Sequence, residues 1–194
     1  DVVLTLSGGL FLLPLFLGIC VWIKTDSQGP AIYKQRRVGK DGKEFDCYKF
    51  RSMVVDSKER LEKLLATDPK AKEEWERDFK LKNDPRITKS GAFLRKTSLD
   101  ELPQLLNVLK GEMSLVGPRP IVQKEVPRYE QYIKEYYMVL PGITGLWQVS
   151  GRSDTTYPER VAMDMWYVHN WSVWLDLVLL WRTVAAVIQS RGAY

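Results

Sequence analysis

The sequence predicts a mostly helical α+β protein in which a membrane-inserted helix precedes a domain outside the membrane. Three observations lead to this expectation. Residues 2–23 carry no charged side chain, an Asp-Gly turn separates two strand-like runs, and residues 56–82 have leucines at helical spacing, with further segments that read as helices after them. We therefore assign residues 1–23 to the membrane helix and residues 24–194 to one further domain, with a small antiparallel sheet and amphipathic helices at the membrane surface.

The apolar run is long enough to cross a bilayer as a straight helix. At ~1.5 Å per residue, residues 2–23 reach about 33 Å, and a hydrocarbon core is about 30 Å thick. Pro14 lies near the middle, where it cannot donate to the carbonyl of Leu10 and kinks the helix. The residues alone leave a spanning helix and a re-entrant helix equally open, with a buried core helix as a minor alternative.

An Asp-Gly turn in "KDGKEF" predicts a β-hairpin directly after the apolar run. We expect residues 31–38 and 44–55 to pair antiparallel. Alternation in the second run, "YKFRSM", places Lys49 and Arg51 on the same face. Two cations should therefore lie together on a small sheet.

The rest of the chain predicts helices joined by loops. The seven Trp and nine Tyr suit interfaces, including the edge of a bilayer. The expected segments are a charged helical pair at 56–82, a loop at 83–91, a helix at 102–110 ended by Gly111, a charged helix at 122–138, a glycine-rich loop at 140–152 and two helices within 158–189.

Charge and composition narrow the classes of function. The formal charge of +5 favours an anionic partner: nucleic acid, a phosphorylated substrate or acidic lipid. Cys20 and Cys47 have no metal-ligand spacing, which disfavours a disulfide scaffold or a zinc site. The single histidine, His169, lies among aromatic residues and is expected to be packed or interfacial and not catalytic. Neither a Walker A motif nor G-x-G-x-x-G occurs, which disfavours both common nucleotide-binding folds.

The stretch "KTSLDELPQL" places Asp100 and Glu101 at a predicted helix start. Pro103 is tolerated only in a first helical turn, so the helix begins close to residues 99–102. Ser98 and Glu101 also have capping-box spacing, and capping alone explains such an acidic pair in most proteins. A carboxylate at this position would, however, also meet any phosphate held by the free N–H groups of the helix end.

Basic side chains accompany this acidic pair. Arg95 precedes it, and Arg119 lies between two prolines in "GPRP". The planar guanidinium group matches phosphate oxygens. Phosphoryl transfer needs cations that stabilise developing charge and a carboxylate that attacks or binds Mg²⁺. The pattern therefore favours an anion site beside two carboxylates.

Four ordered blocks, "YKFRSM", "DPRIT", "LRKTSLDELPQLLNVLKGEMSLVGPRP" and "LPGITGLWQVSGR", resemble the bacterial sugar transferase family. These are monotopic phosphoglycosyl transferases that act on polyprenyl phosphate, and the resemblance covers essentially the whole chain. The long segment 56–90 is similar to that of members transferring galactose or glucose to undecaprenyl phosphate. The resemblance implies an enzyme at the cytoplasmic face of a bacterial inner membrane. Its substrates would be a UDP-sugar and undecaprenyl phosphate, and its cofactor Mg²⁺. It would catalyse the first membrane step of O-antigen, capsule or exopolysaccharide synthesis.

The resemblance also implies roles for single residues. Asp100 would attack the β-phosphorus of the UDP-sugar, release UMP and carry the phosphosugar until undecaprenyl phosphate accepts it. The expected sugar is galactose, transferred as galactose 1-phosphate. Glu101 would bind Mg²⁺ together with Asp100 or handle a proton, and Arg95 and Arg119 would bind phosphate. Further candidates for binding phosphate or substrate are Lys49, Arg51 and Arg152, and acidic positions of open role are Asp164 and Asp176.

The resemblance favours a re-entrant helix kinked at Pro14, with both ends on the cytoplasmic side. Family members often carry serine before this proline, whereas this chain has Leu13. The alternative function is a membrane-tethered, non-catalytic anion-binding adaptor, which gives no reason for carboxylates inside a cationic site. We expect membrane lipid and no nucleic acid among the partners, and a homo-oligomer stays open.

Overall fold

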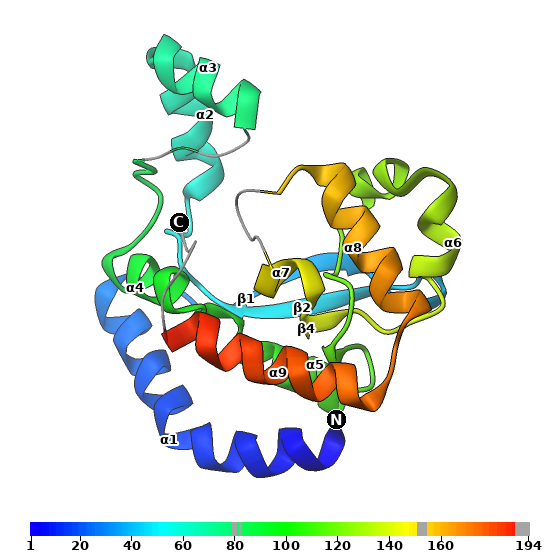
Figure 1. Ribbon diagram of the computed structural model, residues 1–194. Coiled ribbons are helices and arrows are strands. Elements are labelled where there is room, and N and C mark those ends of the chain that lie inside the picture. The colour runs from blue at the N-terminus through cyan, green and yellow to red at the C-terminus, as the bar shows by residue number, and fades with distance from the viewer. Residues whose placement is uncertain (79–80, 82, 151–154, 189–194) are drawn as a thin grey trace.

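The computed structural model describes residues 1–78, 81, 83–150 and 155–188. As predicted, the protein is mostly helical with a small antiparallel sheet (Figure 1). Strands β1 (Ile32–Val38) and β2 (Glu44–Phe50) pair in register from Ile32 opposite Phe50 to Val38 opposite Glu44. The predicted hairpin is therefore confirmed, although its second strand ends at Phe50 and not at residue 55.

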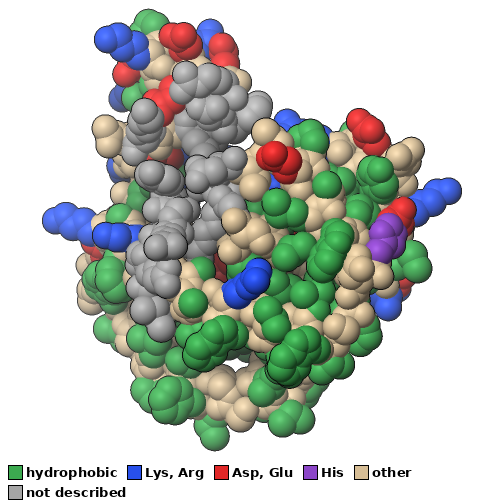
Figure 2. Space-filling view, viewed as in Figure 1, with side chains coloured by type: hydrophobic (Ala, Val, Ile, Leu, Met, Phe, Trp, Pro, Cys, Tyr) green, Lys and Arg blue, Asp and Glu red, His purple; other side chains and the backbone are tan. Residues whose placement is uncertain are grey.

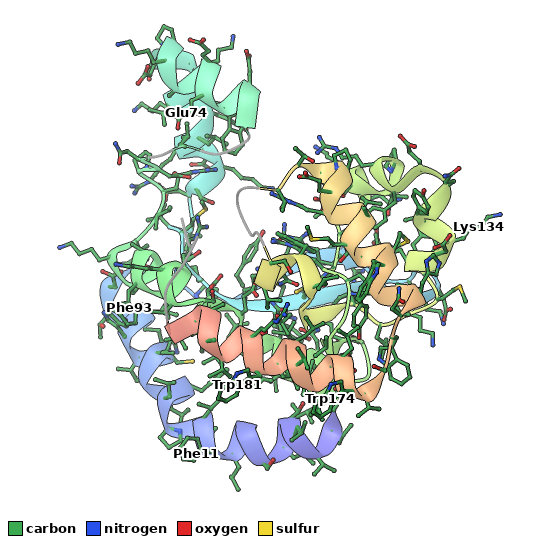
Figure 3. All side chains as sticks on the ribbon, viewed as in Figure 1. Phe11, Glu74, Phe93, Lys134, Trp174 and Trp181 are labelled. Atoms are coloured by element: carbon green, nitrogen blue, oxygen red, sulfur yellow. The ribbon has the colours of Figure 1, made fainter. Side chains whose placement is uncertain are left out.

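Helix α1 (Val2–Asp26) is the apolar segment. Among the described residues it is the one helix long and apolar enough to cross a membrane, judged by length and composition. It contains Pro14 and bends near its middle (Figure 1). Phe11, labelled near this bend in Figure 3, is 84% exposed. The bend matches the kink expected from the sequence, while the re-entrant geometry stays a prediction.

The C-terminal turns of α1 belong to the core of the domain. Ile19 and Ile23 are buried against Phe50 of β2 and Leu94 of helix α4 (Lys89–Thr97). This packing fixes the end of the apolar helix relative to the sheet.

Helix α4 corrects the loop expected over residues 83–91, because the helix begins at Lys89 within that range. Thr88 caps it by accepting a hydrogen bond from the Gly91 N–H at 3.0 Å. A Cβ at Gly91 would lie 2.0 Å from the carbonyl oxygen of Ser52. Glycine therefore permits α4 to pack directly on the segment that follows β2.

The acidic motif begins with a 3-10 helix, η2 (Leu99–Gln104), and continues as α5 (Leu105–Leu109). The helix start near residues 99–102 and the terminal glycine, Gly111 with φ 73°, are confirmed. The capping box is wrong: the Ser98 side chain makes no capping bond, because Ser98 adopts a left-handed φ of 57° and ends α4.

Two later segments differ from expectation. The range 122–138 is not one helix, because Pro127 and the positive φ of Glu130 (48°) divide it into η3 (Gln123–Tyr132) and α6 (Ile133–Tyr136). The expected loop at 140–152 contains a strand and a short helix. These elements are β4 (Gly142–Thr144), which pairs parallel with β3 (Ser114–Val116), and α7 (Leu146–Ser150).

The two predicted helical pairs are confirmed. They are α2 (Ser57–Thr67) with α3 (Pro69–Asp78), and α8 (Tyr157–His169) with α9 (Val173–Ile188). In Figure 1, α2 and α3 project from one end of the molecule, whereas α9 and α1 lie at the other. Hydrophobic side chains gather over α1 and α9 in Figure 2. Trp174 and Trp181 of α9, labelled in Figure 3, are 74% and 75% exposed, as an interfacial helix requires.

Candidate active site

One cavity of about 820 Å³ brings the predicted site residues together. Its wall is formed by the end of β2, by η2, by the loop after β3, and by parts of α7, α8 and α9. The predicted residues on this wall are Lys49, Arg51, Arg95, Asp100, Glu101 and Arg119. Arg152 lies outside the residues that the structure describes.

Asp100 is a half-buried carboxylate in this wall. Burial and the neighbouring negative charge of Glu101 raise its pKa to about 6, while Lys49 and Arg95 act in the opposite direction. At neutral pH Asp100 is ionised, and a carboxylate with a raised pKa is a better nucleophile than an ordinary one.

Glu101 is held by an ion pair, since its Oε1 lies 2.6 Å from the Lys49 Nζ. Burial favours its neutral form, but the charge of Lys49, followed by that of Arg119, outweighs burial and holds the pKa of Glu101 below its ordinary value. Glu101 therefore has a lowered pKa, whereas the pKa of Asp100 is raised to about 6. The two adjacent carboxylates are chemically distinct.

Arg95 and Arg119 direct positive charge toward the cavity. The Arg95 Nε donates to the Ser52 Oγ at 2.9 Å. Side chains fix the Arg119 loop through its backbone carbonyls: the Tyr136 hydroxyl donates to the Arg119 carbonyl at 3.2 Å, and the Arg37 Nη1 donates to the Pro120 carbonyl at 3.0 Å. In the described part of the chain, neither Arg95 nor Arg119 has a carboxylate within 4.0 Å.

Arg51 is engaged by the backbone that follows α1. Its guanidinium donates to the carbonyls of Ser27, at 2.7 Å, and of Gln28. It is 6% exposed. Arg51 thus ties the end of the apolar helix to the rim of the cavity, and its role in binding substrate stays a prediction.

Asp164 and Asp176 are not among the residues that line the cavity. Asp164 is buried and accepts a hydrogen bond from the Tyr129 hydroxyl at 2.7 Å. Burial raises its pKa to about 7 against the effects of Tyr129 and Arg119. Asp176 accepts from the Tyr167 hydroxyl at 2.7 Å. Each carboxylate accepts a hydrogen bond that joins a helix to a neighbouring segment. This structural contact accounts for both residues without a direct part in the reaction.

Three cavity residues escaped the sequence reasoning: Arg37, Trp147 and Arg160. Arg37 could have been suspected, because "QRRVG" is basic and precedes the hairpin turn. Trp147 lies in a glycine-rich stretch with no recognisable chemical spacing, and Arg160 lies on a charged helix where a solvated side chain is expected. Only the folded chain brings all three to the cavity wall that also carries the carboxylates.

Asp100 and Glu101 are too few to hold a metal ion alone, but they fit a metal ion that is also coordinated by the substrate. Within the described ranges, no group of three or more His, Cys, Asp or Glu side chains is arranged to hold a metal ion. Mg²⁺ commonly takes one or two carboxylates and completes its shell with substrate phosphates and water. Asp100 and Glu101 meet that requirement, although Lys49 already occupies one oxygen of Glu101.

Comparison with known proteins places the chain in a family. Residues 1–190 match the model described as "Bacterial sugar transferase". The chain belongs to the bacterial sugar transferase family. This family membership was expected from the four sequence blocks and is confirmed.

Three similar relatives carry informative names. The chain is 61% identical over 179 residues to the undecaprenyl-phosphate galactose phosphotransferase of Salmonella typhimurium, covering 92% of this chain and 38% of that protein. It is 56% identical over 194 residues to the UDP-galactose-lipid carrier transferase of Erwinia amylovora, covering 100% and 40%. It is 51% identical over 181 residues to the exopolysaccharide production protein ExoY of Rhizobium meliloti, covering 93% and 80%. The chain thus spans about two fifths of the length of the first two relatives.

Proposed function

We propose that this bacterial sugar transferase moves a sugar 1-phosphate, with galactose 1-phosphate as the first candidate, from a UDP-sugar to undecaprenyl phosphate. UMP is the other product. The observation that carries the proposal is Asp100, a half-buried carboxylate with a pKa of about 6, in a cavity wall that also presents Arg95 and Arg119. The names of the relatives support the same substrate classes.

The reaction has two displacements at phosphorus. An oxygen of Asp100 attacks the β-phosphorus of the UDP-sugar, and the bond to the bridging oxygen breaks so that UMP leaves with its electron pair. A phosphate oxygen of undecaprenyl phosphate then attacks the same phosphorus and releases the Asp100 carboxylate. Arg95 and Arg119 stabilise the negative charge that develops on the phosphoryl oxygens in both steps.

Glu101 and Lys49 set the properties of the nucleophile. Burial and, second, the charge of Glu101 raise the pKa of Asp100, and the charge of Lys49 opposes both. We infer that Mg²⁺ is bound by Asp100 and Glu101 with the substrate phosphates and that, when bound, it shields the negative charge of the diphosphate. Arg51 contributes by fixing the end of α1 next to these groups.

The positions of the apolar surfaces support a membrane geometry for the protein. We propose that α1 enters the cytoplasmic face of the inner membrane as a re-entrant helix bent at Pro14, with α9 at the lipid surface. The cavity reaches Thr183 and Val187 of α9, so a lipid-anchored phosphate approaching along that helix would meet the site. A cysteine label placed before Asp1 is expected to react only from the cytoplasmic side, and labelling from the periplasm would contradict the hairpin.

The activity is tested by UMP release. The native protein, Asp100→Asn and Asp46→Asn are incubated with Mg²⁺, undecaprenyl phosphate and either UDP-galactose or UDP-glucose. Asp46, which lies on β2 within 4.0 Å of Lys34 and Arg36, serves as the matched control. We expect native-like release from Asp46→Asn and none from Asp100→Asn. Turnover by Asp100→Asn would refute the nucleophile, and no release from any UDP-sugar would favour the adaptor function.

A further inference from the structure

Two guanidinium groups lie against one indole ring in the cavity wall. The Cζ of Arg119 is 5.8 Å from the centre of the Trp147 ring, and the Cζ of Arg160 is 4.7 Å from it. All three side chains line the cavity, yet they come from the loop after β3, from α7 and from α8. Three separate segments thus converge to place two cations against one indole ring.

Neither cation is neutralised by the described part of the protein. The Arg160 Nε donates to the Thr155 Oγ1 at 3.2 Å, and no carboxylate of the described residues lies within 4.0 Å of either guanidinium. By contrast, Lys49 is paired with Glu101, and Arg37 has Glu125 at 3.7 Å. Two half-buried, uncompensated arginines at a cavity wall favour an anionic ligand.

The two arginines differ in their relation to the nucleophile. Arg119 is among the charges that act most strongly on Glu101, and Arg95 is among those acting on Asp100, whereas Arg160 is in neither group. The cavity wall thus combines Arg95, whose charge acts on Asp100, Arg119, whose charge acts on Glu101, and Arg160, which lies against Trp147. A diphosphate with its β-phosphorus at Asp100 carries a second phosphate, and Arg119 and Arg160 are uncompensated cations of the same cavity wall that match such a group.

We propose that Arg160, held on Trp147 beside Arg119, binds the phosphate monoester that Asp100 displaces from the β-phosphorus and then the one that displaces Asp100. This inference rests on the proposed function. An in-line displacement puts the entering and leaving groups opposite the bond to Asp100, so the phosphate of undecaprenyl phosphate must occupy the position that the UMP phosphate has vacated. The same two arginines would then serve both half-reactions, and UMP and the lipid phosphate would exclude one another.

Direct binding of UMP tests the site without any turnover. UMP is titrated into the native protein, Arg160→Gln and Arg128→Gln by calorimetry in detergent. Arg128 is the matched control, because it also lies over an aromatic ring, 4.9 Å from the centre of Tyr157, but is not among the residues lining the cavity. We expect Arg160→Gln to weaken UMP binding at least about tenfold, because the variant loses one charge-assisted hydrogen bond. Arg128→Gln should bind UMP as the native protein does.

Further readouts separate ligand binding from a structural effect. The UMP affinity of the native protein should fall more steeply with ionic strength than that of Arg160→Gln. If Arg160→Gln does not fold, Arg160→Lys, which keeps the charge and loses the planar fork, must still bind UMP more weakly than the native protein. Native affinity in whichever of these variants folds would overturn the proposal.

The shared position is tested by competition. In the native protein, UMP should inhibit competitively against undecaprenyl phosphate, and Arg160→Gln should raise the KM for both substrates. Noncompetitive inhibition, or a change in only one KM, would overturn the shared site. If UMP binding depends on Arg160 but no UDP-sugar releases UMP, the binding site stands and the proposed function fails.

Discussion

Replacing Asp100 by asparagine should make the protein more stable at neutral pH while abolishing its proposed activity. The folded protein holds this carboxyl group in a place that disfavours its ionised form, first by burial and second by the charge of Glu101. Asparagine has nearly the same shape and no charge, so the variant avoids this cost. An essential group that lowers stability is typical of a functional site.

The magnitude follows from the pKa. A folded-state pKa of about 6 in place of the ordinary 3.8 corresponds to about 3 kcal/mol at pH 8. The cavity is open to solvent, which screens the charges, so we expect about 1–2 kcal/mol. Because the pKa is raised on folding, the cost is fully present above pH 7, decreases as the pH falls through 6, and is absent below the unfolded value near 4.

The assay is thermal unfolding in detergent at pH 8 and at pH 4. We expect Asp100→Asn to raise the Tm by about 2–8 °C at pH 8 and to leave it nearly unchanged at pH 4. Asp84→Asn is a control of opposite sign, because hydrogen bonds from Arg86 outweigh burial and hold the pKa of Asp84 below its ordinary value. It should lower the Tm at pH 8. A lower Tm for Asp100→Asn at pH 8 would refute the electrostatic account of the site.

Three other substitutions test separate parts of the structure. Glu101→Gln removes the charge that raises the pKa of Asp100, so the acidic limb of the pH profile of UMP release should move below pH 6; an unchanged limb would contradict the coupling. Gly91→Ala should lower the free energy of unfolding by about 3 kcal/mol, whereas Gly8→Ala, with open space around it, should not. Arg51→Ala should increase hydrogen exchange of residues 23–30, and native-like protection there would show that Arg51 does not fix the end of α1.

Local signals in the sequence predicted much of the fold. The Asp-Gly turn predicted the hairpin because φ is positive at both turn residues, Asp41 (59°) and Gly42 (70°). Uniform apolarity predicted α1, and helical spacing predicted the two terminal helices. These features depend on neighbouring residues, so a sequence pattern can reveal them.

Features that depend on tertiary contacts were missed. Helix α4 contains Gly91, which weakens a local helix signal and is explained only by the close approach of Ser52. The capping box failed because Ser98 ends the preceding helix, a helix that the sequence reasoning had not placed. The pairing of β3 with β4 likewise joins segments too far apart for any local pattern.

The candidate site also has features that the sequence predicted and features that depend on tertiary contacts. Asp100, Glu101, Arg95 and Arg119 were predicted from motifs and resemblance, and the fold brings them to one cavity. The pairing of Lys49 with Glu101 spans 52 residues and makes the two carboxylates chemically unequal. No spacing in the sequence contains that information.

The most direct test of the central claim is the mass of the protein after reaction with the donor alone. The native chain, incubated with UDP-galactose and Mg²⁺ without undecaprenyl phosphate and quenched in acid, should release one UMP per active protein and gain one hexose phosphate. Peptide mapping should place that group on Asp100, and undecaprenyl phosphate should remove it. A native protein that transfers sugar phosphate to the lipid without this adduct, or with the adduct on another residue, would contradict the account.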